Sequence, residues 1–252
     1  MPPEPLDLLH LGRERVIGVY LLETAQGRAL FDCGPATCVP VLKQRLRERG
    51  VELQVHVSPV GAPHLIDPGR LEQSARRLYG DEFDTLWGEL APVPQENVRE
   101  TGDRMLGLEC FPSPGHASHH VCYLDRDGTL YAGDAAGVRI QPSRFVLPPT
   151  PPPEFDLAAW ESTLDELERR APERLALIHF GVAEDPSEHL AELRERLRAW
   201  TSLVGDGASE DEFETAGTAE LGEDEPPYQQ AMPLWQSYAG LRRYWDKRRE
   251  AA

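Results

Sequence analysis

The order of hydrophobic and polar positions in the first part of the chain predicts two strands, a helix and a third strand. Residues 16–24 form an apolar run rich in β-branched and aromatic side chains, and residues 29–32 resume it after a turn, as in a β-hairpin. Apolar residues then recur at helical spacing over residues 41–49, and Gly50 ends this pattern. Residues 51–58 alternate between apolar and polar positions, which is typical of a half-buried strand.

The middle of the chain predicts helices first and short strands afterwards. Residues 70–79 and 81–90 carry apolar side chains at helical spacing. Short apolar runs bounded by Gly and Asp turns indicate strands at residues 98–100, 106–111, 121–124, 129–132 and 175–181. Closely spaced prolines between positions 141 and 153 predict an irregular surface loop.

Two further helices are indicated by the residues at their starts. Asp156 is a favourable N-cap for a helix that continues to Arg170. Asp185 and Glu188 predict a capping box, with Pro186 at the first helical position, for a helix to about residue 200. The chain therefore alternates strands and helices, which predicts an α/β sandwich of two mixed sheets flanked by helices.

The last fifty residues differ in composition from the rest. Residues 203–228 contain no Lys or Arg and many acidic residues, so we expect a disordered linker over residues 202–228 that buries little apolar surface. We assign residues 1–201 to one folded domain and residues 229–252 to an amphipathic helix that docks on it. The apolar face of this helix carries Leu234, Tyr238, Leu241 and Trp245.

The composition and net charge of the chain exclude some classes of binding partner. The formal net charge is −17 and the pI is near 4.9, which argues against a nucleic acid or an anionic membrane as the main partner. The first residues carry no signal-peptide pattern, and no apolar run is long enough to span a membrane. We therefore expect a cytoplasmic protein with four reduced cysteines, and both a small-molecule substrate and a homodimer stay open.

Candidate chemistry is concentrated where strand-like runs end. Residues 111–134 read FPSPGHASHHVCYLDRDGTLYAGD, in which a Pro/Gly-rich loop carries His116, His119 and His120, and Asp134 follows the last apolar run. A separate run, LALIHFG, carries His179 near its end. Imidazole nitrogen and carboxylate oxygen are the donors that zinc and similar divalent ions take, so these positions predict a metal site.

These motifs, taken in order, resemble the metallo-β-lactamase-fold hydrolases. PSPGHASHH, then strand, turn, strand and AGD, then LALIHFG, resemble the second half of that fold, and VYLLET with ALFDCGP resembles its opening strands. GAPHLIDP and TPPPEFD look like a bacterial subgroup similar to glyoxalase II. The resemblance implies a metallo-β-lactamase-like αββα sandwich and a zinc-dependent hydrolase of a small thioester, lactone or other activated ester.

The resemblance also implies roles for particular residues. His116 would bind a first zinc, Asp134 would bridge two zincs, and His179 would bind the second. Asp32 would be a carboxylate that orients the ligands. The residues implied to line the substrate pocket are His64 and His120.

One part of the family pattern is missing from this sequence. The family carries an HxHxDH ligand motif after its first helix, whereas here residues 47–53 run directly into residues 54–57, so one internal βα unit is lacking near residues 50–56. The family holds two zincs, and the remaining ligands imply zero or one here, because a catalytic zinc takes three protein ligands. Two hypotheses follow: a hydrolase impaired by this loss, or a non-catalytic binding module, which includes an internally deleted sequence.

Overall fold

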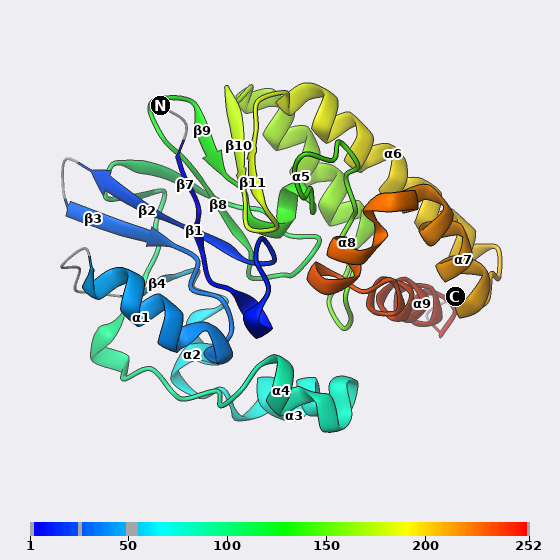
Figure 1. Ribbon diagram of the computed structural model, residues 1–252, viewed down its shortest axis with the longest axis horizontal. Helices are drawn as coiled ribbons and strands as arrows, with labels where there is room; N and C mark the ends of the chain where they lie inside the picture. The colour runs from blue at the N-terminus through cyan, green and yellow to red at the C-terminus, as the bar shows by residue number, and fades with distance from the viewer. Residues whose placement is uncertain (1–2, 25–26, 49–54, 251–252) are drawn as a thin grey trace.

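The computed structural model describes residues 3–24, 27–48 and 55–250, and its central feature is a pair of facing β-sheets between layers of helices (Figure 1). The N-terminal sheet is antiparallel with strand order β1–β2–β3. Its strands are β1 (Leu6–Asp7), β2 (Gly18–Thr24) and β3 (Gly27–Phe31). The run at residues 16–32 therefore forms the predicted hairpin.

The second sheet brings the carboxyl ends of two strands that are distant in sequence, β9 and β10, to the same side of the sheet. Its strand order is β11–β10–β9–β8–β7–β6, and its strands are β6 (Arg104–Met105), β7 (Leu108–Pro112), β8 (Val121–Leu124), β9 (Thr129–Tyr131), β10 (Arg174–Leu177) and β11 (Gly181–Ala183). β9 and β10 are parallel, and the connection between them contains helix α5 (Leu157–Arg170). Because parallel strands end on the same side, residues that follow β9 and β10 lie close together.

A short parallel pair, β4 (Val55–Val57) and β5 (Val98–Glu100), follows the first helix. The helices on this side are α1 (Val39–Arg47), α2 (Ala62–Ile66), α3 (Gly69–Tyr79) and α4 (Phe83–Leu86). The predicted helix at 81–90 is thus shorter than expected. Residues 49–54, which contain most of the predicted junction at residues 50–56, lie outside the described residues.

Three groups of buried side chains hold these layers together. Between the sheets, Tyr20 and Leu22 pack with Tyr123 and Tyr131. The N-terminal sheet also buries its other face against α1, and the second sheet buries its outer face against α5 and the helices that follow. Helix, sheet, sheet and helix therefore form four layers, which confirms the predicted αββα sandwich.

The start of α5 agrees with the sequence prediction, whereas the start of α6 (Pro186–Gly205) does not. The Asp156 carboxylate accepts a hydrogen bond from the Ala159 amide at 2.8 Å. Asp185 makes no such side-chain cap, so the predicted capping box is wrong. Its carboxylate instead pairs with Arg139 at 2.7 Å and Arg144 at 2.6 Å, because two guanidinium groups bind a carboxylate more strongly than backbone amides do.

The prediction of a disordered acidic linker over residues 202–228 is wrong. α6 continues to Gly205, and α7 (Glu210–Leu221) and α8 (Glu225–Ala231) follow. Phe213, Leu221 and Tyr228 are almost fully buried. The acidic residues lie mostly on exposed positions, so these few apolar side chains are enough to fix the segment on the body.

The C-terminal helix α9 (Leu234–Glu250) packs against α6 and α7 (Figure 1). Leu234 and Leu241 are fully buried, and Trp245 donates a hydrogen bond to the Thr201 carbonyl at 2.8 Å. None of the helices in the described part of the chain has the length and apolar character needed to cross a membrane.

Candidate metal centre

Three of the residues singled out in the sequence meet where the strands of the second sheet end. His116 lies in the loop between β7 and β8, Asp134 follows β9, and His179 follows β10. His116 Nε2 lies 3.5 Å from Asp134 Oδ2, and His179 Nε2 lies 3.7 Å from Asp134 Oδ1. Their side chains keep 16%, 25% and 14% exposure respectively, so a solute can reach them. We call this group the histidine–aspartate cluster.

The turn that presents Asp134 depends on a glycine. Gly133 has φ +51°, a left-handed conformation that L side chains rarely adopt. A Cβ at this position would also lie 2.7 Å from His120 Nε2. Gly133 therefore allows the chain to turn directly after β9 and bring the Asp134 carboxylate beside the two imidazoles.

Backbone carbonyls fix the orientation of both imidazoles. His116 Nδ1 lies 2.9 Å from the Pro149 carbonyl oxygen, and His179 Nδ1 lies 2.6 Å from the Val16 carbonyl oxygen. A carbonyl oxygen only accepts, so in each ring Nδ1 carries the hydrogen. In the neutral ring Nε2 then has a free lone pair, and in both residues this atom faces Asp134.

The Nε2–carboxylate distances suit an ion between the groups better than a direct contact. At 3.5 and 3.7 Å they are longer than ordinary N–H···O hydrogen bonds. Two ligands that are each about 2.1 Å from a zinc in tetrahedral geometry lie about 3.4 Å apart. The donor atoms, their tautomers and their spacing thus fit a divalent cation in kind.

The number of ligands does not fit a complete centre. Within residues 3–24, 27–48 and 55–250, no group of three His, Cys, Asp or Glu side chains converges so that it could hold a metal ion. The reason is visible in the cluster itself, since each imidazole faces a different oxygen of Asp134. As the side chains stand, an ion beside either oxygen of Asp134 has two ligands, fewer than the three protein ligands of a catalytic zinc, and both imidazoles would reach one ion only after the side chains move.

Charge in the cluster favours an ionised carboxylate. Burial by itself would raise the pKa of Asp134, but the neighbouring His116, His179 and His120 outweigh it and hold that pKa below its usual value. The ionised carboxylate attracts a cation, and in the neutral form of the two rings their Nε2 lone pairs face that cation as well.

Asp32 lies at the end of β3 in a left-handed conformation, with φ +68°. Its Oδ1 accepts hydrogen bonds from the Cys33 amide at 2.6 Å and the Gly34 amide at 2.9 Å. Burial raises the pKa of Asp32, and Asp134 also raises it. Asp32 is therefore close enough to the cluster to feel its charge, while its hydrogen bonds go to its own turn.

The other histidines of the loop lie around the cluster. His120 Nδ1 lies 2.7 Å from Ser113 Oγ, and its ring is 6.3 Å from that of His116. Burial, followed by the nearby His116, lowers the pKa of His120 to about 4. His64 on α2 faces His119 with ring centres 6.3 Å apart, and His119 Nδ1 lies 3.9 Å from a Glu154 carboxylate oxygen.

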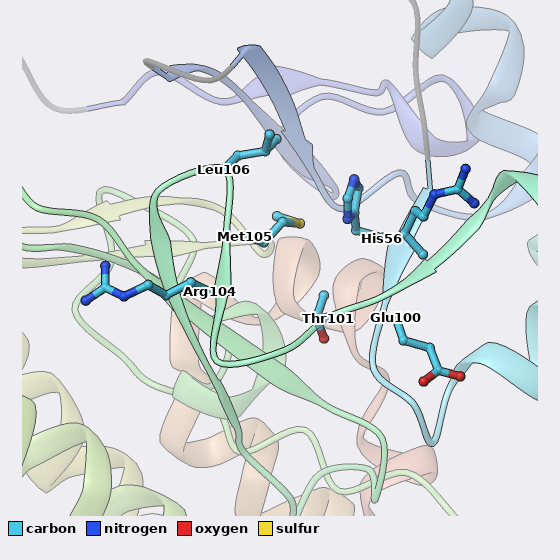
Figure 2. A pocket seen from close by; sticks show the side chains of 7 residues that line it. His56, Glu100, Thr101, Arg104, Met105 and Leu106 are labelled. Carbon is cyan, nitrogen blue, oxygen red and sulfur yellow. The ribbon is translucent and has the colours of Figure 1, made fainter.

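His56 does not join the cluster. It lines a separate cavity of about 400 Å³, whose other lining residues are 99–101, in and after β5, and 104–106, in and after β6. Figure 2 shows His56 on one side of this cavity and Met105 and Leu106 on the other. The cavity lining contains no member of the histidine–aspartate cluster, so His56 is a suitable control position.

His189, a buried histidine outside the cluster, predicts an acid-sensitive fold. Its Nε2 lies 2.6 Å from the Ala136 carbonyl oxygen, its Nδ1 is buried without a partner, and burial lowers its pKa to about 4. The unfolded chain binds this proton more readily, so stability is full above about pH 6.5 and falls as the pH drops toward 4, by about 3 kcal/mol in total.

Urea unfolding at several pH values checks this expectation. His189→Gln keeps a side-chain donor for Ala136 without a titrating ring, so its stability curve should be flatter than that of the wild type between pH 6.5 and 4. Parallel curves for the two proteins would show that His189 does not carry this acid sensitivity.

Comparison with known proteins identifies the family. Residues 54–182, just over half of the chain, match the sequence profile of the metallo-beta-lactamase superfamily, and the chain belongs to that superfamily. Among curated protein sequences, none matches this chain.

Solved structures agree with this assignment at the level of fold. An archaeal metallo-beta-lactamase superfamily protein from Sulfolobus tokodaii is 20% identical with a TM-score of 0.64, covering 96% of each chain. A metallo-beta-lactamase family protein from Thermus thermophilus is 18% identical with a TM-score of 0.59, covering 93% of this chain and 89% of that one. A beta-lactamase domain protein from Burkholderia ambifaria is 18% identical with a TM-score of 0.58, covering 92% and 83%.

Sequence reasoning selected the members of the cluster but missed the groups that orient them. The Pro149 and Val16 carbonyls lie 33 and 163 residues from the imidazoles they hold. Backbone carbonyls have no signature in a sequence, so no signal could have indicated them. Two side-chain partners were also missed: Ser113, in the same loop as His120, and Glu154, which is distant in sequence and lies near His119.

Proposed function

We propose that this chain is a hydrolase whose site is the histidine–aspartate cluster, acting with one bound divalent cation, zinc in the first instance. The observation that carries this proposal is the orientation of the two rings: both Nε2 lone pairs face one ionised carboxylate at 3.5 and 3.7 Å. Superfamily membership supports a hydrolase-type activity.

A cation held by these residues would polarise a carbonyl oxygen and lower the pKa of a bound water. The chain's own part would be to hold His116, Asp134 and His179 in their observed orientation. We assign to Asp32 an orienting role beside Asp134, on the basis of its electrostatic coupling to that residue. His64 and His120 would line the entrance to the cluster.

For the substrate we propose a small thioester, lactone or other activated ester, in keeping with the resemblance to a glyoxalase-II-like subgroup. The partly exposed side chains of the cluster are open to solvent. We further propose that the protein works in the cytoplasm.

The missing HxHxDH motif limits this activity. Because His116, Asp134 and His179 must move to reach one ion, we expect a zinc dissociation constant of about 0.1 to 1 μM, weaker than that of complete structural zinc sites. Turnover should accordingly be slow, and should depend on zinc added to the assay.

A second candidate function is a binding module without catalysis. It is favoured by one observation, the lack of any three converging metal ligands among the described residues. In this case the imidazoles of the cluster would hold a small anion or acyl compound, and no bond would be broken.

A hydrolysis screen separates the two functions. Aryl esters, thioesters and lactones would be assayed with and without added zinc, using wild type, His179→Ala and the matched control His56→Ala. The hydrolase proposal expects slow zinc-dependent hydrolysis that His179→Ala removes and His56→Ala retains. Zinc bound without hydrolysis of any class would favour the binding module.

A further inference from the structure

The C-terminal helix makes an unusually close contact with the proline-rich loop beside the cluster. A Cβ placed on Gly240 of α9 would lie 1.9 Å from the Thr150 carbonyl oxygen, 2.8 Å from the Pro151 carbonyl carbon and 2.9 Å from the Pro152 nitrogen. All three neighbours are backbone atoms, which cannot rotate aside as a side chain can. Only glycine at position 240 lets the helix and the loop approach to this distance.

Hydrogen bonds fasten the same two segments on either side of Gly240. Thr150 Oγ1 donates to the Ser237 carbonyl at 3.1 Å, and Thr150 is fully buried. Lys247 Nζ donates to the Pro153 carbonyl at 3.0 Å. The loop is thus held to α9 along the stretch from residue 150 to residue 153.

The loop residue next to this contact orients a member of the cluster. The carbonyl of Pro149, adjacent to Thr150, accepts the hydrogen of His116 Nδ1 at 2.9 Å. We infer that α9 positions His116: the contact at Gly240 sets the place of residues 149–153, and the Pro149 carbonyl thereby fixes which nitrogen of His116 faces Asp134. Gly240 and Thr150 are positioning residues, since neither contacts the cluster itself.

This role links the C-terminal segment to the cluster across the fold. α9 and the His116 loop are separated by about half of the chain, and residues 149–153 contact both of them. His179 has an independent anchor, the Val16 carbonyl at the start of the N-terminal sheet. A disturbance at Gly240 should therefore reach His116 and leave His179 unchanged.

The test is the tautomer of each imidazole, read from the ring ¹⁵N shifts in two-bond ¹H–¹⁵N spectra at about pH 8, where imidazole is ordinarily neutral. In the wild type both His116 and His179 should show hydrogen on Nδ1. In Gly240→Ala, His116 should shift toward the Nε2–H form, while His179 in the same spectrum stays as it was.

Two more variants keep the result interpretable. Gly217→Ala is the matched control, because the atoms nearest to a Cβ at this position of α7 belong to the side chain of Leu234, at 2.9 Å, and not to a backbone. It should leave both tautomers unchanged. Thr150→Val removes the hydrogen bond to Ser237 with little change of shape. It should move the His116 tautomer in the same direction as Gly240→Ala but by less, and it provides the test if Gly240→Ala does not fold.

The inference is overturned if Gly240→Ala and Thr150→Val both fold and His116 keeps its hydrogen on Nδ1 in both variants. Zinc affinity gives a second readout that rests on the proposed function, with an expected loss of about 10-fold or more in Gly240→Ala. A changed tautomer in a protein that never binds zinc supports the positioning role and contradicts the proposed function. Normal zinc binding with an unchanged tautomer supports the proposed function and contradicts the positioning role.

Discussion

Replacing Asp134 by asparagine should reduce zinc affinity by at least about 100-fold, because the change removes the charge that both imidazoles share. Losing a residue that merely orients a ligand costs about 10- to 100-fold, so losing the shared carboxylate should cost the upper value or more. The amide keeps the shape of the side chain, and its uncharged oxygen cannot offset two imidazole lone pairs around a cation. Calorimetric titration with zinc measures the change directly.

Two matched variants show whether this effect belongs to the cluster. Asp127→Asn changes a carboxylate on the turn between β8 and β9, where Asp127 pairs with Arg174, and it should bind zinc as the wild type does. Asp32→Asn should produce an intermediate loss of about 10-fold, as expected for an orienting group. Equal zinc affinity in wild type and Asp134→Asn would exclude Asp134 as a ligand.

Replacing Tyr228 by alanine should destabilise the fold by about 3–5 kcal/mol, the usual range for removing a large buried aromatic side chain. Tyr228 is fully buried, donates to the Phe145 carbonyl at 2.6 Å and accepts from the Ile140 amide at 3.1 Å. Tyr228→Phe leaves those two backbone groups without their partner, and should cost about 2–4 kcal/mol. Chemical unfolding monitored by circular dichroism gives both values.

The same experiment tests whether the acidic segment is part of the folded body. Glu223 lies a few residues from Tyr228 and is exposed, so Glu223→Gln should change stability by no more than about 0.5 kcal/mol. If residues 202–228 were a disordered linker, all three variants would have the same free energy of unfolding as the wild type. A graded series, with alanine worst and Glu223→Gln unchanged, is the expected result.

The sequence predicted those elements whose signals are local. α5 begins after Asp156 and ends at Arg170 as expected, because an N-cap hydrogen bond and an apolar helix face act within a few residues. β8 has the predicted bounds for the same reason, since its apolar run lies between clear turns. The parallel pairing of β9 and β10, which brings Asp134 near His179, depends on chain-wide topology.

In the acidic segment, the high charge led to a prediction of disorder although the segment forms a helix. Phe213, Gly217 and Leu221 recur at a spacing of four residues and are all buried. The acidic residues between them occupy the other face, and Ser209 with Glu212 forms a capping box at the start. Composition over twenty residues suggested disorder, whereas the periodicity within that stretch indicated an amphipathic helix.

Distant partners account for the remaining differences. Asp185 leaves its cap because Arg139, 46 residues away, lies within 2.7 Å of it. The candidate cluster was accessible to sequence reasoning because its side chains are chemically distinctive. The carbonyls that orient His116 and His179 were not, since they belong to Pro149 and Val16, whose identity carries no chemical signal.

The central claim is that His116, Asp134 and His179 together bind a divalent cation. Elemental analysis after dialysis against about 10 μM zinc, roughly 100 times the weakest constant of a complete site, tests it most directly. The account predicts close to one zinc per chain in wild type and in His56→Ala, and close to none in His116→Ala. A folded wild-type protein without zinc, or a His116→Ala variant that retains it, would contradict the account.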